Sequence, residues 1–130
     1  MTTALTSVVP GSDGPVRFAH DSERRFARIL DFYGVAWEYE PVEFVLAWGP
    51  DGRPTSGFRP DFWLPTPGLF VEVTTMNQRL VTKKNGKVRR MAALYPDVRV
   101  TLLHQRDTLA LLAKYGLSGG LEGLAGARSA

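Results

Sequence analysis

Two carboxylate residues stand in surroundings where a charge is unusual. Asp61 follows Pro60 at the start of an apolar run, and Glu72 lies between Val71 and Val73. Burying an unpaired charge in a protein interior is energetically costly, so a carboxylate in such a place needs a partner. We therefore take Asp61 and Glu72 as the first candidates for chemistry in this chain.

The sequence around the two carboxylates predicts a β-hairpin. Residues 58–64 are rich in aromatic side chains and residues 69–74 contain β-branched ones, with prolines and a glycine between the two runs. A turn near Thr66 would leave Asp61 and Glu72 close together on neighbouring antiparallel strands. Two convergent carboxylates suit a hard divalent cation, Mg²⁺ or Mn²⁺, which prefers oxygen ligands and retains several waters.

A run of positive charge follows this hairpin. Residues 78–95 predict a helix that carries six lysine and arginine residues and no acidic one. Asn85-Gly86 is the point at which this helix is expected to be weakest. Helices gain stability from pairs of opposite charge, and a like-charged helix is typical of proteins that bind an anionic partner, most often nucleic-acid phosphates. A basic face that is only solvated is the other interpretation. The residues expected to contact phosphates are Arg79, Lys83, Arg89 and Arg90.

One lysine interrupts the apolar face of this helix. Lys84 lies three residues after Val81 and four residues before Val88, on the side expected to face the sheet. A lysine directed there would be paired by the two carboxylates of the hairpin. Lys87 lies one turn further along and slightly off this face, so it is the second candidate. The expected apolar face consists of Val81, Val88, Met91, Ala92 and Tyr95.

The remaining segments complete an α/β pattern. The apolar spacing of residues 22–33 predicts a helix, and residues 35–48 predict either one bent strand or two short strands. Residues 98–103 predict a final strand, reached through the basic helix as a crossover and placed next to the strand of Glu72. A last helix is expected over residues 107–115.

The composition fits one globular domain. We expect it to span residues 16–117 of the 130, between a flexible arm over residues 1–15 and a flexible tail over residues 118–130. No cysteine is present, which excludes disulfides and cysteine-based zinc sites and is compatible with a reducing cytoplasm. No apolar run approaches the ~20 residues that span a bilayer, and no signal peptide is apparent. We therefore expect a cytoplasmic protein without membrane contact.

The order of these features resembles the PD-(D/E)XK nuclease superfamily over most of the chain. Pro60-Asp61, followed eleven residues after the aspartate by Glu72-Val73-Thr74, is similar to the superfamily motif. The resemblance implies a restriction-endonuclease-like α/β core with the order helix, three antiparallel strands, helix and strand, followed here by a C-terminal helix. The sequence departs from the pattern at one position, because Thr74 stands where the third motif residue is usually lysine.

The resemblance implies a metal-dependent nuclease that hydrolyses phosphodiester bonds in DNA. Asp61 and Glu72, with the carbonyl of Val73, would hold one or two magnesium ions. A glutamate on the first helix often joins such a site, and Glu23 matches that position. The metal would lower the pKa of a bound water and stabilise charge on the phosphate.

Because Thr74 stands at the usual lysine position, either another residue supplies the catalytic positive charge or the chain lacks it. Lys84, or failing that Lys87, would orient the attacking water and support the developing negative charge. Thr74 could hydrogen-bond a metal-bound water but supplies no positive charge.

Two alternatives to a nuclease stay open. One is a module of the same fold that binds nucleic acid without cutting it, and the other is a small domain whose basic helix binds an acidic protein. DNA is favoured over RNA as the partner. A homodimer would supply two sites for the two strands of a duplex, and no interface for it can be read from the sequence.

Overall fold

The computed structural model describes residues 16–75 and 77–117. The arm predicted over residues 1–15 and the tail predicted over residues 118–130 lie outside the described residues. Within the described ranges, no helix is both long enough and apolar enough to cross a membrane. The described elements form a mixed α/β fold with three α-helices.

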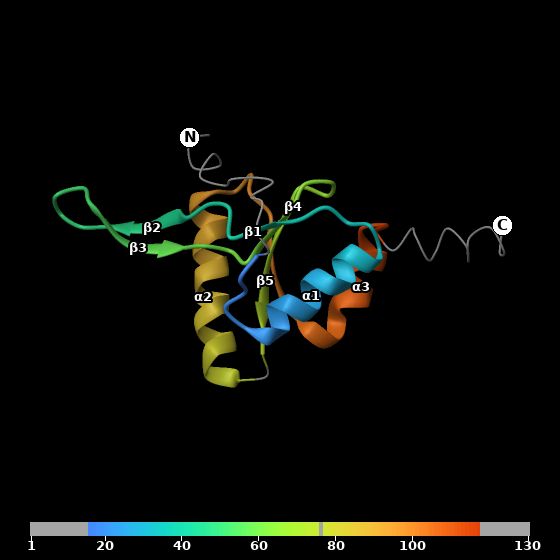
Figure 1. The fold of residues 1–130 in the computed structure, drawn as a ribbon. Helices are drawn as coiled ribbons and strands as arrows, with labels where there is room; N and C mark the ends of the chain where they lie inside the picture. The colour runs from blue at the N-terminus through green and yellow to red at the C-terminus, as the bar shows by residue number, and fades with distance from the viewer. Residues whose placement is uncertain (1–15, 76, 118–130) are drawn as a thin grey trace.

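A four-stranded mixed sheet lies at the centre of the fold (Figure 1). Its strands follow the order β1 (Glu38–Tyr39), β4 (Phe62–Leu64), β5 (Leu69–Thr74) and β6 (Val100–His104). β4 is antiparallel to both β1 and β5, whereas β6 runs parallel to β5. A parallel pair needs a crossover connection, and α2 (Gln78–Leu94) provides it, as predicted.

Two further strands form a hairpin of their own. β2 (Phe44–Trp48) and β3 (Pro54–Phe58) make a two-stranded sheet that extends away from the central sheet beside α2 (Figure 1). Residues 35–48 thus supply two short strands, in different sheets. The prediction of one strand over residues 58–64 is wrong, because β3 ends and β4 begins within that range. Pro60 lies at the break, where its missing N–H cannot continue a ladder.

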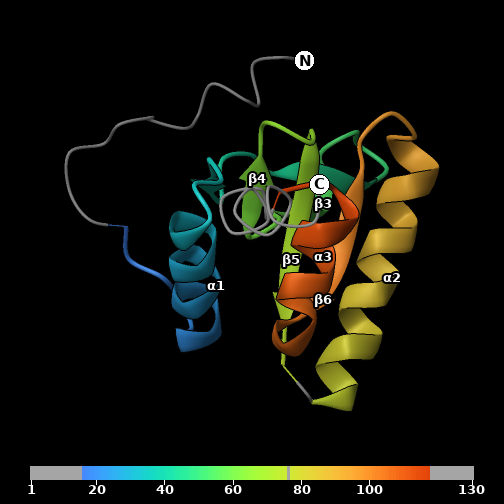
Figure 2. The ribbon, with the colours of Figure 1, turned by 90° about the vertical axis from the view of Figure 1, so that its right-hand side faces the viewer.

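The helices cover the two faces of the central sheet. α1 (Asp21–Phe32) and α3 (Thr108–Lys114) lie on one face and α2 on the other (Figures 1 and 2). All six residues of β5 are buried, and alternate residues of a strand point to opposite faces. The residues of β5 that share a core with α1 and α3 have odd numbers, so Glu72 points toward α2. This core includes Phe26, Leu30, Leu69, Val71, Val73, Leu103, Leu111 and Leu112.

The basic helix packs against the sheet largely as its spacing predicts. α2 is continuous over 17 residues despite the weak point expected in its middle. The Asn77 side chain caps its start by accepting a hydrogen bond from a backbone N–H of the first turn. Val81 and Met91 are buried, whereas Ala92 is exposed and does not belong to the apolar face.

Candidate active site

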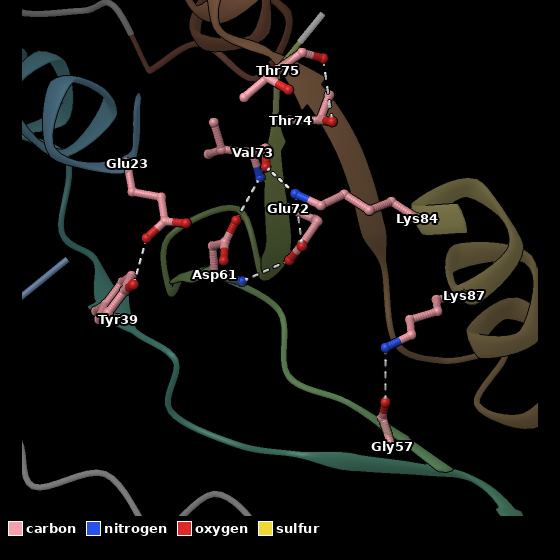
Figure 3. A network of polar contacts seen from close by, with 10 residues as sticks. All are labelled: Glu23, Tyr39, Gly57, Asp61, Glu72, Val73, Thr74, Thr75, Lys84 and Lys87. Atoms are coloured by element: carbon pink, nitrogen blue, oxygen red, sulfur yellow. Dashed lines mark hydrogen bonds and ion pairs between the residues drawn. The ribbon is translucent and has the colours of Figure 1, made fainter. Parts of the chain in front are cut away.

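Asp61 and Glu72 lie side by side where β4 begins (Figure 3). The register of β4 and β5 pairs Phe62 with Val71, so the next pair outward is Asp61 with Glu72. The backbone N–H of Asp61 donates to Oε1 of Glu72 at 3.1 Å, and the N–H of Val73 donates to Oδ2 of Asp61 at 2.9 Å. The structure thus brings the two carboxylates together, as their spacing predicted.

Lys84 reaches this pair from α2. Its Nζ donates to the carbonyl of Val73 at 2.7 Å and lies 3.3 Å from Oε2 of Glu72 (Figure 3). The Lys84 side chain is only 25% exposed. Lys87 instead directs its Nζ to the carbonyl of Gly57 in β3, at 3.3 Å. Of the two lysine candidates, Lys84 is therefore the one that contacts the carboxylate pair.

Thr74 supplies no charge to the site. It is 2% exposed and lies opposite His104 in the parallel pair of β5 and β6. Its hydroxyl donates to the carbonyl of Thr75 at 3.4 Å. Nδ1 of His104 is buried and has no hydrogen-bond partner among the described residues. The ammonium that contacts Glu72 comes from Lys84 on the neighbouring helix rather than from the strand.

Glu23 approaches the pair from the opposite side, on α1 (Figure 3). It is buried, and its Oε1 accepts a hydrogen bond from the hydroxyl of Tyr39 in β1. Burial and then this hydrogen bond raise the pKa of Tyr39, so the hydroxyl keeps its proton at neutral pH. No sequence pattern marks Tyr39 as part of the site, because its contact depends on β1 lying next to α1.

The carboxyl groups of this site repel one another when all of them are ionised. Burial, followed by the charges of Glu72 and Glu23, raises the pKa of Asp61 from its ordinary 3.8 to about 8. Burial also raises the pKa of Glu72, and the neighbouring Lys84 ammonium opposes that shift. Three buried carboxyl groups with one adjacent ammonium therefore favour either a bound proton or an added cation.

The oxygen donors suit a cation that needs few protein ligands. Within residues 16–75 and 77–117, no group of three or more His, Cys, Asp or Glu side chains is arranged to hold a metal ion. Magnesium is commonly held by one or two carboxylates together with substrate phosphates and waters. Asp61, Glu72 and the carbonyl of Val73 fit this mode. Glu23 lies near them but is hydrogen-bonded to Tyr39, and its place as a further ligand stays a prediction.

The side chains predicted to bind phosphates differ in their surroundings. Arg90 donates from Nε to the carbonyl of Leu46 in β2 at 3.0 Å, and Tyr95 donates from its hydroxyl to the carbonyl of Val45 at 2.8 Å. These bonds attach the β2–β3 hairpin to α2, so Arg90 has a structural contact of its own. The four residues of the predicted set are all exposed: Arg79, Lys83, Arg89 and Arg90.

In comparisons with known proteins, no family model, curated protein or solved structure matches the chain. The motif formed by Asp61, Glu72 and Thr74 therefore stands as a resemblance to PD-(D/E)XK nucleases. The chemistry of this site is inferred from its own residues.

Proposed function

We propose that this protein is a metal-dependent nuclease that hydrolyses phosphodiester bonds, with DNA as the favoured substrate. The observation that carries the proposal is the convergence of Asp61, Glu72 and Lys84 at one buried cluster. Phosphodiester hydrolysis needs a cation held beside the phosphate and positive charge where negative charge develops. The two carboxylates meet the first need, and the ammonium of Lys84 meets the second.

Each residue of the cluster has a distinct task in this reaction. Asp61, Glu72 and the carbonyl of Val73 would hold Mg²⁺ or Mn²⁺, with Glu23 as the further candidate. When bound, the ion would act as a Lewis acid toward the phosphate and lower the pKa of water. Lys84 would stabilise the charge that develops on the phosphate oxygens and orient the attacking water.

The arrangement of the helices and strands supports the same proposal. α1 precedes three antiparallel strands of the central sheet, and α2 then leads into the parallel strand β6. This is the order expected of a restriction-endonuclease-like core, with the β2–β3 hairpin inserted after its first strand. The exposed cations of α2 lie on the helix that carries Lys84 and would hold the backbone of a nucleic acid without reading its sequence.

The test is cleavage of a panel of nucleic acids by the wild type and by two variants. Duplex, single-stranded and branched DNA and RNA are incubated with Mg²⁺, with Mn²⁺, or with a chelator. We expect cation-dependent cleavage that Asp61→Asn and Glu72→Gln each reduce by about 10²-fold or more. The amide introduced by Asp61→Asn keeps an oxygen to accept the N–H of Val73, so the fold is expected to persist.

A matched control separates the site from a general effect of lost charge. Asp97→Asn removes an exposed carboxylate from the turn before β6 and should leave cleavage unchanged. Wild-type cleavage by Asp61→Asn or Glu72→Gln would show that the site lies elsewhere. If the wild type binds nucleic acid with a strong salt dependence but cuts none, the non-catalytic module is the correct interpretation.

A further inference from the structure

Lys84 occupies oxygen atoms that a divalent cation would need. Its Nζ lies 2.7 Å from the carbonyl oxygen of Val73 and 3.3 Å from Oε2 of Glu72 (Figure 3). Both groups belong to the proposed metal-ligand set. Two of the three proposed ligands therefore already contact a cation, which is the ammonium of the protein itself.

An ammonium and a metal ion compete for these oxygens because both are positively charged. Magnesium binds oxygen at about 2.1 Å and the Lys84 nitrogen lies 2.7 Å from the Val73 carbonyl oxygen, so an ion on that carbonyl would lie at most about 5 Å from this nitrogen. Two positive charges at that distance repel strongly in a buried site, where water screens them poorly. Movement of the ammonium away from Val73 and Glu72 therefore favours binding of the metal by the carbonyl and both carboxylates.

A phosphate gives the ammonium a second place to bind. The lysine side chain has a flexible four-carbon stem and a charge that pairs well with phosphate oxygens. Lys84 is partly exposed, so its Nζ has a path from the carboxylates to an incoming strand. Transfer of the ammonium from Glu72 to a phosphate keeps it paired and frees the oxygens for the metal.

We propose that Lys84 couples metal binding to substrate binding, so that each strengthens the other. This inference rests on the proposed function of the same site. Before substrate arrives, Lys84 neutralises part of the cluster and keeps the affinity for metal low. By linkage, the factor by which nucleic acid raises metal affinity equals the factor by which metal raises nucleic-acid affinity. The cation is then held more firmly when a phosphate is present than when it is absent.

The first test measures metal affinity without any nucleic acid. Mn²⁺ is titrated by calorimetry into the wild type, Lys84→Met and Lys83→Met. We expect Lys84→Met to bind Mn²⁺ about 10-fold more tightly than the wild type, within the usual range of coupling between sites. Lys83→Met removes an exposed ammonium from the adjacent position of the same helix and should change the affinity much less, because solvent screens that charge.

The second test separates displacement of the ammonium from simple repulsion between charges. Ca²⁺ is titrated with and without a cleavage-resistant phosphorothioate DNA oligonucleotide. The oligonucleotide should raise Ca²⁺ affinity about 10-fold or more in the wild type and distinctly less in Lys84→Met, where no ammonium remains to be transferred. Lys84→Gln, which keeps a hydrogen-bond donor without charge, should behave like Lys84→Met and serves if that variant folds poorly.

The outcomes distinguish this inference from the proposed function. Equal enhancement by the oligonucleotide in wild type and variants, or unchanged metal affinity on removal of Lys84, would overturn the coupling. Absence of metal binding in all the proteins would overturn it as well. Absence of cleavage by a wild type that shows the expected coupling would refute the nuclease and leave the coupling intact.

Discussion

Replacing Asp61 by asparagine should make the metal-free protein more stable at neutral and alkaline pH. The raised pKa of Asp61, about 8 against an ordinary 3.8, means that the folded protein holds a proton more tightly than the unfolded chain. This contribution to stability is fully present below about pH 4 and is lost as the pH rises toward 8. The amide of Asp61→Asn does not titrate, so the stability of the variant relative to the wild type increases as the pH rises.

The size of the effect follows from proton linkage. Each pH unit between the unfolded and folded pKa values removes up to about 1.4 kcal/mol of folding free energy. From pH 5 to pH 8 the upper limit is therefore about 4 kcal/mol, and a difference on the order of 2 kcal/mol is expected because Glu72 and Lys84 share the titration. The N–H of Val73 keeps an acceptor in the variant, so the comparison isolates the charge.

The measurement is urea unfolding at four pH values between 5 and 8 with a chelator present. The free energy of unfolding of Asp61→Asn minus that of the wild type should increase with pH. Asp97→Asn should stay within about 0.5 kcal/mol of the wild type throughout, as is usual for an exposed substitution. Added Mg²⁺ should stabilise the wild type at pH 8 by binding the folded state. If the difference in the free energy of unfolding stays constant or falls as the pH rises, the inference that Asp61 holds a proton in the folded protein is refuted.

Two other predictions concern the basic helix and its lysine. Neutralising Lys83 and Arg89 together should weaken binding to all sequences alike and lower the salt slope by roughly 0.9 for each lost contact with duplex DNA. An unchanged slope would place the nucleic acid elsewhere. Lys84→Ala should reduce cleavage about 10²-fold or more, and Thr74→Lys in that background should restore part of the activity. Normal cleavage by Lys84→Ala, Lys87→Ala and the double variant would contradict a catalytic role for either lysine.

The carboxylate pair could be predicted from sequence because its geometry is local. A short turn sets which residues of a hairpin oppose each other, and Asp61 and Glu72 are nearly equidistant from it. Lys84 was predictable for a similar reason. The period of a helix places it between Val81 and Val88, and the structure has it reaching from that side to Glu72.

Features that depend on distant parts of the chain could not be predicted in this way. Residues 58–64 read as one apolar strand, and only Pro60 marks the point where the chain leaves one sheet for the other. The contact between Tyr39 and Glu23 requires β1 and α1 to be neighbours. The partner of Lys87 could not be predicted either, because the carbonyl of Gly57 that accepts its hydrogen bond lies in β3.

The hydrogen bond from Val73 to Asp61 gives the aspartate a structural role that does not depend on catalysis. β4 begins only at Phe62, and the carboxylate of Asp61 accepts a buried N–H of β5 that would otherwise lack this partner. Leaving such a group unpaired costs about 1–3 kcal/mol. A chain of this fold without nuclease activity would therefore still gain stability from an acceptor at position 61, and Lys84 has a structural contact of the same kind with the carbonyl of Val73. The presence of an aspartate at position 61, or of a lysine at position 84, is therefore not by itself a sign of activity.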